Sequence, residues 1–280
     1  QDIRRRIKSV TSTKQITSAM NMVATSRLRH AKEAAQSNRP YAEKVMKTVQ
    51  EVAANAAADA KDPLLEKHPE GKKLLFVVTS DKGLAGAYSS NACKEAISLA
   101  ESTEDTDLVV VGRKGISHFR ARGYHIVDEF AGISDRPSYE DARRIAAKLV
   151  SLYKSGDYRE ITMVYTKFIN SITCTPQSAK LLPFEAEKGG EDGVHVEYIY
   201  EPDAPTVLGF LLPQYIYTTV YAALLQSAAS ELSSRMNAMS NATDNAEDLI
   251  EKMNLHYNKV RQAGITTELN EIVAGAEGLK

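Results

Sequence analysis

One stretch near the C-terminus decides the fold: LLPQYIYTTVYAALLQSAASELSSRMNAMSNATDNAEDLIEKMNLHYNKV, residues 211–260. Read in alternating steps of four and three residues, it forms an apolar or aromatic seam that only two threonines interrupt. The seam positions are Leu211, Tyr215, Thr218, Ala222, Leu225, Ala229, Leu232, Met236, Met239, Thr243, Ala246, Ile250, Met253, Tyr257 and Val260. This is the period of a coiled coil. Because no Gly or Pro falls between Gln214 and Ala263, we expect a helix roughly 75 Å long at about 1.5 Å per residue.

A helix of this length needs a partner of matching length to bury its seam, and the N-terminal end of the chain supplies one. The same 4–3 pattern runs through Ile3, Ile7, Val10, Lys14, Thr17, Asn21, Ala24, Leu28, Ala31, Ala35, Asn38, Ala42, Val45, Val49, Val52 and Ala56. Its polar positions weaken the seam but can fix the register. Ile16, Met20 and Val23 form a second apolar stripe, which predicts more than one neighbour for this helix. Two long terminal helices with a globular segment between them predict an antiparallel hairpin that carries a body.

Composition bounds the class of protein. The 280 residues are 43% hydrophobic and 25% charged, with a formal net charge of −1, as in an ordinary soluble protein of one or two domains. Charge is uneven, because residues 1–47 hold eleven Lys and Arg against three acidic residues. This basic helix is either a solvated face or a surface that docks on an acidic protein or nucleic acid. Cys93 and Cys174 form no CxxC motif, which favours unpaired thiols in a reducing compartment.

The middle of the chain predicts an α/β body. The first helix should run from Asp2 to Ala60, with a bend near Asn38 because Pro40 removes one backbone hydrogen bond. Strands are expected at 74–79, 108–111, 125–130, 160–168 and 194–200, and helices at 89–100, 114–122 and 138–156. Strands rich in Val, Ile and Leu that alternate with helices predict a parallel sheet covered on both faces. The expected divisions are a helix at 1–60, a body at 61–205 and a helix at 206–280, with the two helices forming one shaft.

No motif in the sequence carries chemistry of its own. The loop DKGLAGA, residues 81–87, is either a tight turn between strand and helix or an anion site at a helix N-terminus. Its spacing is neither that of a Walker A motif nor GxGxxG. The six histidines are scattered, without the spacing of metal ligands. We therefore expect no catalytic residues, no metal and no cofactor, and a protein that is not an enzyme by itself.

Two stretches at opposite ends carry a resemblance to one family. ITTELNEIVAGAEGL, residues 265–279, closely resembles the signature of the gamma subunit of F-type ATP synthases, and only Gly278 departs from it. The signature positions are Ile265, Thr266, Glu268, Glu271, Gly275 and Ala276. Residues 3–31 are similar to the family's opening, although Ser18 stands where Lys is common. SDKGLAGAY (80–88) and MNAMSNATDNA (236–246) also look like family sequence, so the resemblance covers the whole chain.

The resemblance implies a fold and a function. The terminal helices would form an antiparallel coiled coil, with a central Rossmann-like α/β domain inserted between them. The coiled coil would be the central-stalk rotor inside a ring of three alpha and three beta subunits, and the body would meet the epsilon subunit and the ring of c subunits. Rotation would couple ion flow across the membrane to ATP synthesis or hydrolysis. The implied location is peripheral, on the cytoplasmic face of a bacterial plasma membrane, with membrane contact only through the complex and no nucleic acid partner.

The resemblance also implies partner-binding residues. Arg261 and Gln262 resemble the residues that catch a beta subunit inside the ring, and Thr266 and Glu268 look like further contacts there. Residues 272–279 resemble the tip that sits in an apolar collar. Met20 resembles the residue that faces an acidic loop of beta, and Arg235 resembles a residue of the same contact region. The two cysteines do not resemble the redox dithiol of plant-type gamma subunits, so no thiol switch is expected.

Two other classes of protein compete with a rotor. A nucleic-acid-binding coiled coil or scaffold with an α/β body would fit the basic N-terminal helix, but no aromatic residue precedes Tyr41 there. A nucleotide-binding enzyme built on the body would need the phosphate-loop spacing that the loop at 81–87 lacks. Salt-dependent binding to duplex DNA would support the first of these, and retention of ATP by the isolated protein the second.

Overall fold

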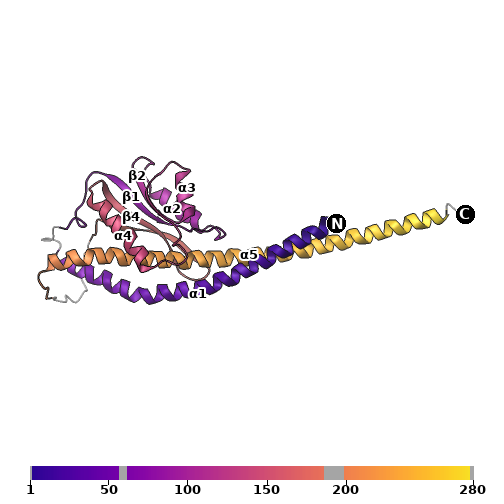
Figure 1. Cartoon of the computed structure of the whole chain (residues 1–280), viewed down its shortest axis with the longest axis horizontal. Coiled ribbons are helices and arrows are strands. Elements are labelled where there is room, and N and C mark those ends of the chain that lie inside the picture. The colour runs from indigo at the N-terminus through magenta and orange to yellow at the C-terminus, as the bar shows by residue number, and fades with distance from the viewer. Residues whose placement is uncertain (1, 57–61, 186–198, 278–280) are drawn as a thin grey trace. The chain divides into compact units, whose positions relative to one another are not determined.

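A computed structural model describes residues 2–56, 62–185 and 199–277 of the chain (Figure 1). Two compact units make up the chain: unit 1 contains Gln1–Ala24 and Met236–Lys280, and unit 2 contains Thr25–Arg235. Two long helices, α1 (Asp2–Ala56) and α5 (Ala204–Glu277), each contribute to both units. The predicted end of the first helix at Ala60 lies outside the described residues. The predicted divisions at 60 and 205 remain a prediction.

Unit 1 is an antiparallel pair of helices. Moving forward along α1, the Arg4 guanidinium donates to the Tyr257 hydroxyl, Lys14 pairs with Glu247 at 2.8 Å, and the Thr17 and Thr243 hydroxyls lie 2.8 Å apart. The residue numbers of the α5 partners thus decrease as those of the α1 residues increase, so the two helices run antiparallel. Seam residues from both helices are buried, namely Thr17, Ala24, Met239 and Ala246. The predicted antiparallel coiled coil is confirmed in this unit.

The second apolar stripe of α1 is covered only at its middle residue within the described residues of unit 1. Ile16 is 60% exposed and Val23 is 53% exposed, while Met20 between them is half-buried. The neighbour that this stripe predicts is therefore not another element of unit 1.

Unit 2 is built on a five-stranded sheet of order β3-β2-β1-β4-β5. Its strands are β1 (Lys72–Val78), β2 (Thr106–Val111), β3 (His125–Phe130), β4 (Tyr158–Phe168) and β5 (Cys174–Leu182). The first four are parallel, as predicted, whereas β5 pairs antiparallel with β4. The sequence did not predict β5, because four polar residues and a proline break up the apolar residues of CTPQSAKLL, as an edge strand permits. The strand predicted at 194–200 lies almost entirely outside the described residues.

Helices cover both faces of the sheet, as predicted. Along β1, Leu75 and Val77 pack with α2 (Tyr88–Leu99) and α3 (Arg113–Arg120). Phe76, from the opposite face of the same strand, packs with α4 (Tyr139–Lys154) and with the parts of α1 and α5 that belong to unit 2 (Figure 1). Successive side chains of a strand point to opposite faces, so one continuous apolar run serves two cores. Helix α4 begins with a capping box formed by Ser138 and Asp141.

Helix α5 begins before the predicted helix and is apolar along much of its length. It starts at Ala204, so Pro205 lies in its first turn, where the missing N–H costs nothing, and Pro213 lies inside it. By length and composition alone it could cross a membrane. In unit 2, however, its apolar side chains belong to the core: Leu208, Leu212, Ile216, Val220 and Leu224. Packing against the sheet therefore accounts for that apolar character.

Candidate functional site

The last part of α5 is a helix without a partner in the described part of the chain. Seam residues up to Tyr257 are at least partly covered, but every residue from 258 to 274 is exposed. Arg261, Gln262 and Glu268 have no hydrogen bond or ion pair from their side chains among the described residues, whereas the Thr266 hydroxyl donates to the Gln262 carbonyl oxygen at 2.9 Å. The structure thus brings four predicted contact residues together on one exposed helical segment.

Large apolar side chains accompany these polar ones. Ile265, Leu269, Ile272 and Val273 are all exposed, Ile272 by 68%. Ile265, Leu269 and Ile272 follow steps of four and three, so they share one side of the helix. Single exposed apolar residues are ordinary, but a cluster beside charged groups is typical of a protein-binding surface. The part of the predicted tip at 278–279 lies outside the described residues.

Arg235 has a different environment from the other predicted contacts. Its side chain is 10% exposed and pairs with the carboxylate of Glu231, 2.7 Å away on the preceding turn of α5. The same guanidinium nitrogen donates to the carbonyl oxygen of Gly83 at 3.3 Å. Arg235 therefore contacts the loop at 81–87 within unit 2.

The loop at 81–87 is a tight turn held by its own chain. Leu84 and Gly86 have positive φ angles of 62° and 56°. The Asp81 carboxylate accepts backbone N–H bonds from Arg113 and Ser134. Burial acts to raise the pKa of Asp81, but backbone hydrogen bonds from Gly132, Ser134 and Arg113 outweigh it and hold that pKa below its ordinary value. Since the loop presents carbonyl oxygens to the Arg235 cation, the structure favours the tight turn over the anion site.

Sequence reasoning missed the groups around Arg235. Glu231 is fully buried, and Ser227, Ser230 and Ser233 on the same stretch of α5 are buried too. All four are polar residues between apolar seam positions, and that pattern is the one signal that could have identified them. Burial raises the pKa of Glu231, and Arg235 opposes this without reversing it.

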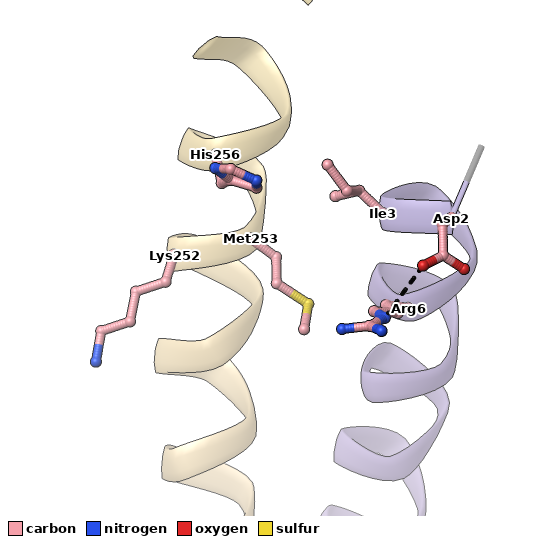
Figure 2. Close-up of a pocket in the computed structure, with 6 residues that line it drawn as sticks. All are labelled: Asp2, Ile3, Arg6, Lys252, Met253 and His256. Carbon is pink, nitrogen blue, oxygen red and sulfur yellow. Dashed lines mark ion pairs between the residues drawn. The ribbon is translucent and has the colours of Figure 1, made fainter. Parts of the chain in front are cut away.

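Unit 1 also holds a half-open cavity of about 320 Å³. Asp2, Ile3, Arg6, Lys252, Met253 and His256 line it. Figure 2 shows Met253 directed from α5 toward α1 and Lys252 directed away from it. Arg6 is already paired with Asp2 at 3.5 Å. Within the described residues, no group of three His, Cys, Asp or Glu side chains could hold a metal ion.

Fold and surface together define the class: a protein in which an antiparallel helix pair and an exposed helix end accompany an α/β unit. Comparison with known proteins identifies the family. A family model described as ATP synthase matches residues 1–279. The ATP synthase gamma chain of Desulfitobacterium hafniense is 43% identical, covering 100% of this chain and 99% of the relative. The sodium-ion-specific gamma chain of Acetobacterium woodii is 39% identical, covering 100% and 98%. The chain belongs to the gamma-chain family of ATP synthases.

Solved structures agree with this assignment. A chain from the central stalk and c-ring structure of the Tetrahymena thermophila mitochondrial ATP synthase is 27% identical, with a TM-score of 0.63, over 81% of this chain and 99% of that one. A chain from the Euglena gracilis mitochondrial ATP synthase has a TM-score of 0.59 at 14% identity, over 94% and 95%, and supports the fold alone.

Proposed function

We propose that this chain works as the rotating central-stalk subunit of an F-type ATP synthase, coupling ion flow across a membrane to ATP synthesis or hydrolysis. It is a non-catalytic gamma-type subunit and carries out no reaction of its own. The observation that carries the proposal is the full-length similarity to gamma chains, together with an exposed helix end where the family has its ring contacts. A rotor needs a stiff shaft and an asymmetric surface, and the paired helices of unit 1 supply both.

The proposed partners follow from the same reading. Unit 1 would lie inside a ring of three alpha and three beta subunits, and the α/β body would meet the epsilon subunit and the c-subunit ring. The complex would lie on the cytoplasmic face of a bacterial plasma membrane, and this chain would touch the membrane only through it. Ion transport would be carried out by the other subunits.

The proposed ring contacts fall into two groups. Arg261, Gln262, Thr266 and Glu268 would bind a beta subunit from the exposed end of α5. Arg261 suits this because its planar guanidinium can hold a carboxylate at two points. Met20 would contact an acidic loop of beta from the exposed stripe of α1.

Arg235 is proposed to belong to the same contact region as Met20. Because Glu231 and the Gly83 carbonyl already engage its guanidinium, any effect on beta would pass through the position of the loop at 81–87.

Nucleic-acid binding is not favoured as an alternative. Much of the basic charge of α1 is paired with acidic groups of the same unit. Within unit 1 these pairs are Arg5 with Asp2, Arg6 with Asp2 and Lys14 with Glu247, and within unit 2 they are Arg27 with Asp135, Arg29 with Glu33, and Arg39 with Glu43. Such pairing leaves fewer cations to neutralise phosphates, which is the main source of affinity for duplex DNA.

The proposal is tested by assembly and activity. This chain is co-expressed with the alpha and beta subunits of its own organism, and Mg-ATPase activity is measured on the purified assembly. We expect one copy of the chain per ring and activity above that of alpha and beta alone. Arg261→Ala combined with Gln262→Ala should lower the activity about tenfold or more, since truncating one side of a buried charged contact typically costs about 2–5 kcal/mol.

A matched control removes the same kinds of side chain from a different position on α5. Lys252→Ala with Asn254→Ala also removes one cation and one amide from exposed positions on α5. This pair should leave the activity near that of the wild type. A chain that never co-purifies with the ring would refute the proposed function, and equal effects of the two pairs would refute the assignment of Arg261 and Gln262.

A further inference from the structure

The sheet of unit 2 has a topological switch point between β1 and β4. From β1 the chain proceeds through α2 to β2 on one side, whereas β4 lies on the other side of β1. In open parallel α/β sheets, the crevice outside the carboxyl ends of two such strands is where ligands ordinarily bind. What occupies this crevice therefore decides what the body can do.

Helix α5 occupies the β4 side of the crevice with a row of polar side chains. The backbone N–H groups of Thr166 and Phe168, at the carboxyl end of β4, donate to the Ser227 hydroxyl at 3.3 Å and the Gln226 side-chain oxygen at 3.1 Å. In return, the Ser230 hydroxyl donates to the Thr166 carbonyl oxygen at 3.1 Å. The edge groups that would otherwise face a ligand are thus bonded to a helix.

Two further contacts hold the same stretch of α5. Beyond β4, the Ser233 hydroxyl donates to the Ser171 carbonyl oxygen in the turn before β5, at 2.8 Å. On the β1 side, Arg235 donates to the carbonyl oxygen of Gly83 and is held by the buried carboxylate of Glu231. Residues 226–235 of α5 are therefore fixed to the carboxyl end of β4, to the turn before β5 and to the loop that follows β1.

We propose that residues 226–235 of α5, seated in the switch-point crevice between β1 and β4, are the joint through which torque passes between the shaft helix and the α/β body. This inference rests on the proposed rotor function. The crevice serves as a socket for the chain's own helix, and the residues that act are Gln226, Ser227, Ser230, Glu231, Ser233 and Arg235. These are positioning residues, because they hold two parts of one rotor in fixed relation.

The polar side chains of residues 226–235 are suited to resist a twisting force. Apolar contacts resist separation but let surfaces slide, whereas hydrogen bonds to fixed backbone groups depend on direction. The joint bonds α5 to backbone groups of β4 and of two turns, so turning the helix about its axis would break several bonds at once. Buried groups that lose such bonds find no water to replace them, which makes slippage costly.

The test weakens the joint and then rescues it with a covalent bond. The whole complex is reconstituted in vesicles, and two quantities are measured: ATP hydrolysis and the ATP-driven membrane potential, read with a voltage-sensitive dye that serves for any coupling ion. Ser227→Ala with Ser230→Ala should lower the potential generated per ATP hydrolysed several-fold. The matched control is Ser90→Ala with Ser98→Ala, two exposed serines on α2 that bond only to their own helix, and it should change neither quantity.

The rescue uses a native thiol. Burial raises the pKa of the Cys174 thiol, and the nearby hydroxyls of Ser230 and Ser233 oppose this, so Ser233 is the position on α5 from which to link to it. Adding Ser233→Cys to the weakened variant and oxidising it should link β5 to α5 and restore the potential per ATP, and a reductant should reverse this. A variant with Ser233→Ala in the same background should not respond to the oxidant.

Each result decides the question. Uncoupling by the serine pair that oxidation repairs supports the joint. The proposal is overturned if the serine pair behaves like its control or if the link fails to form. It is also overturned if Ser233→Cys alone, oxidised in the otherwise wild-type enzyme, stops activity, since the helix and body would then have to move past one another. If the chain does not join the ring, the proposed function fails instead, and linking in the isolated chain still decides whether α5 stays in the crevice.

Discussion

Glu231 and Arg235 form a buried ion pair that the sequence leaves easy to overlook. The second carboxylate oxygen of Glu231 is buried without a hydrogen-bond partner among the described residues. A buried pair adds little to stability by itself, because the cost of desolvation cancels most of the attraction. Removing one partner, however, leaves the other charge buried and uncompensated. The pair therefore matters more for the position of α5 than for the free energy of unfolding.

The cost of breaking this ion pair can be measured in the isolated protein. Arg235→Met should lower the free energy of unfolding by about 3–5 kcal/mol, because it leaves Glu231 buried and uncompensated. Glu231→Leu with Arg235→Met should recover most of that loss. Urea unfolding at neutral pH measures both. A double variant as unstable as the single one would show that Arg235 stabilises through its contact with the loop at 81–87.

Asp81 gives a second prediction, in which the sign of the pH dependence is fixed. Its folded-state pKa is lowered, so the stability it contributes is present above its unfolded pKa and is lost as the pH falls through the folded one. Asp81→Asn should therefore cost about 1–2 kcal/mol at pH 7 through weaker bonds to Arg113 and Ser134. The two proteins should converge in acid. Urea unfolding across pH 3 to 7 tests this, and a constant difference would contradict it.

At the scale of elements, the seam of unit 1 is weakened in the middle by two threonines that bond to one another. Polar residues at seam positions fix register and reduce stability. Thr17→Val with Thr243→Val should therefore raise the free energy of unfolding by about 0.5–1.5 kcal/mol through added apolar burial. Thermal unfolding measures the change. Thr11→Val, at a half-buried position off the predicted seam, serves as the control, and an equal gain there would remove the seam explanation.

The elements also show which parts of a fold a sequence can reveal. The 4–3 seams and the apolar runs of β1 and β2 predicted their elements correctly, because burial on a fixed period leaves a pattern in the residues themselves. Edge strand β5 left none, since one side of it needs no cover. The exposed contact residues at 261–268 came from family resemblance, and their roles remain predictions. Glu231 and the serines of α5 could not be placed, because their partners are backbone groups of distant strands.

At the scale of the whole molecule, the exposed end of α5 can be separated from the rest of the fold. Every residue from 261 to 274 is exposed, and none belongs to a core of the described residues. Deleting residues 261–280 should therefore change the free energy of unfolding of the isolated protein by less than about 0.5 kcal/mol, as for other surface changes. Urea unfolding tests this. The same deletion should abolish the gain in ATPase activity on assembly with alpha and beta, and a marked loss of stability would show a hidden packing role.

The pairing of α5 with α1 stops near Tyr257, and this has a mechanical consequence. Where two helices pack along a seam, one cannot be twisted without the other, so the pair is stiff. Beyond Tyr257 a single helix carries any load alone, with only its own i→i−4 hydrogen bonds to resist. Compliance is therefore concentrated in the last turns of α5. In the proposed rotor this segment would act as a torsion spring, storing elastic strain at the proposed beta contacts and smoothing stepwise motion into continuous rotation.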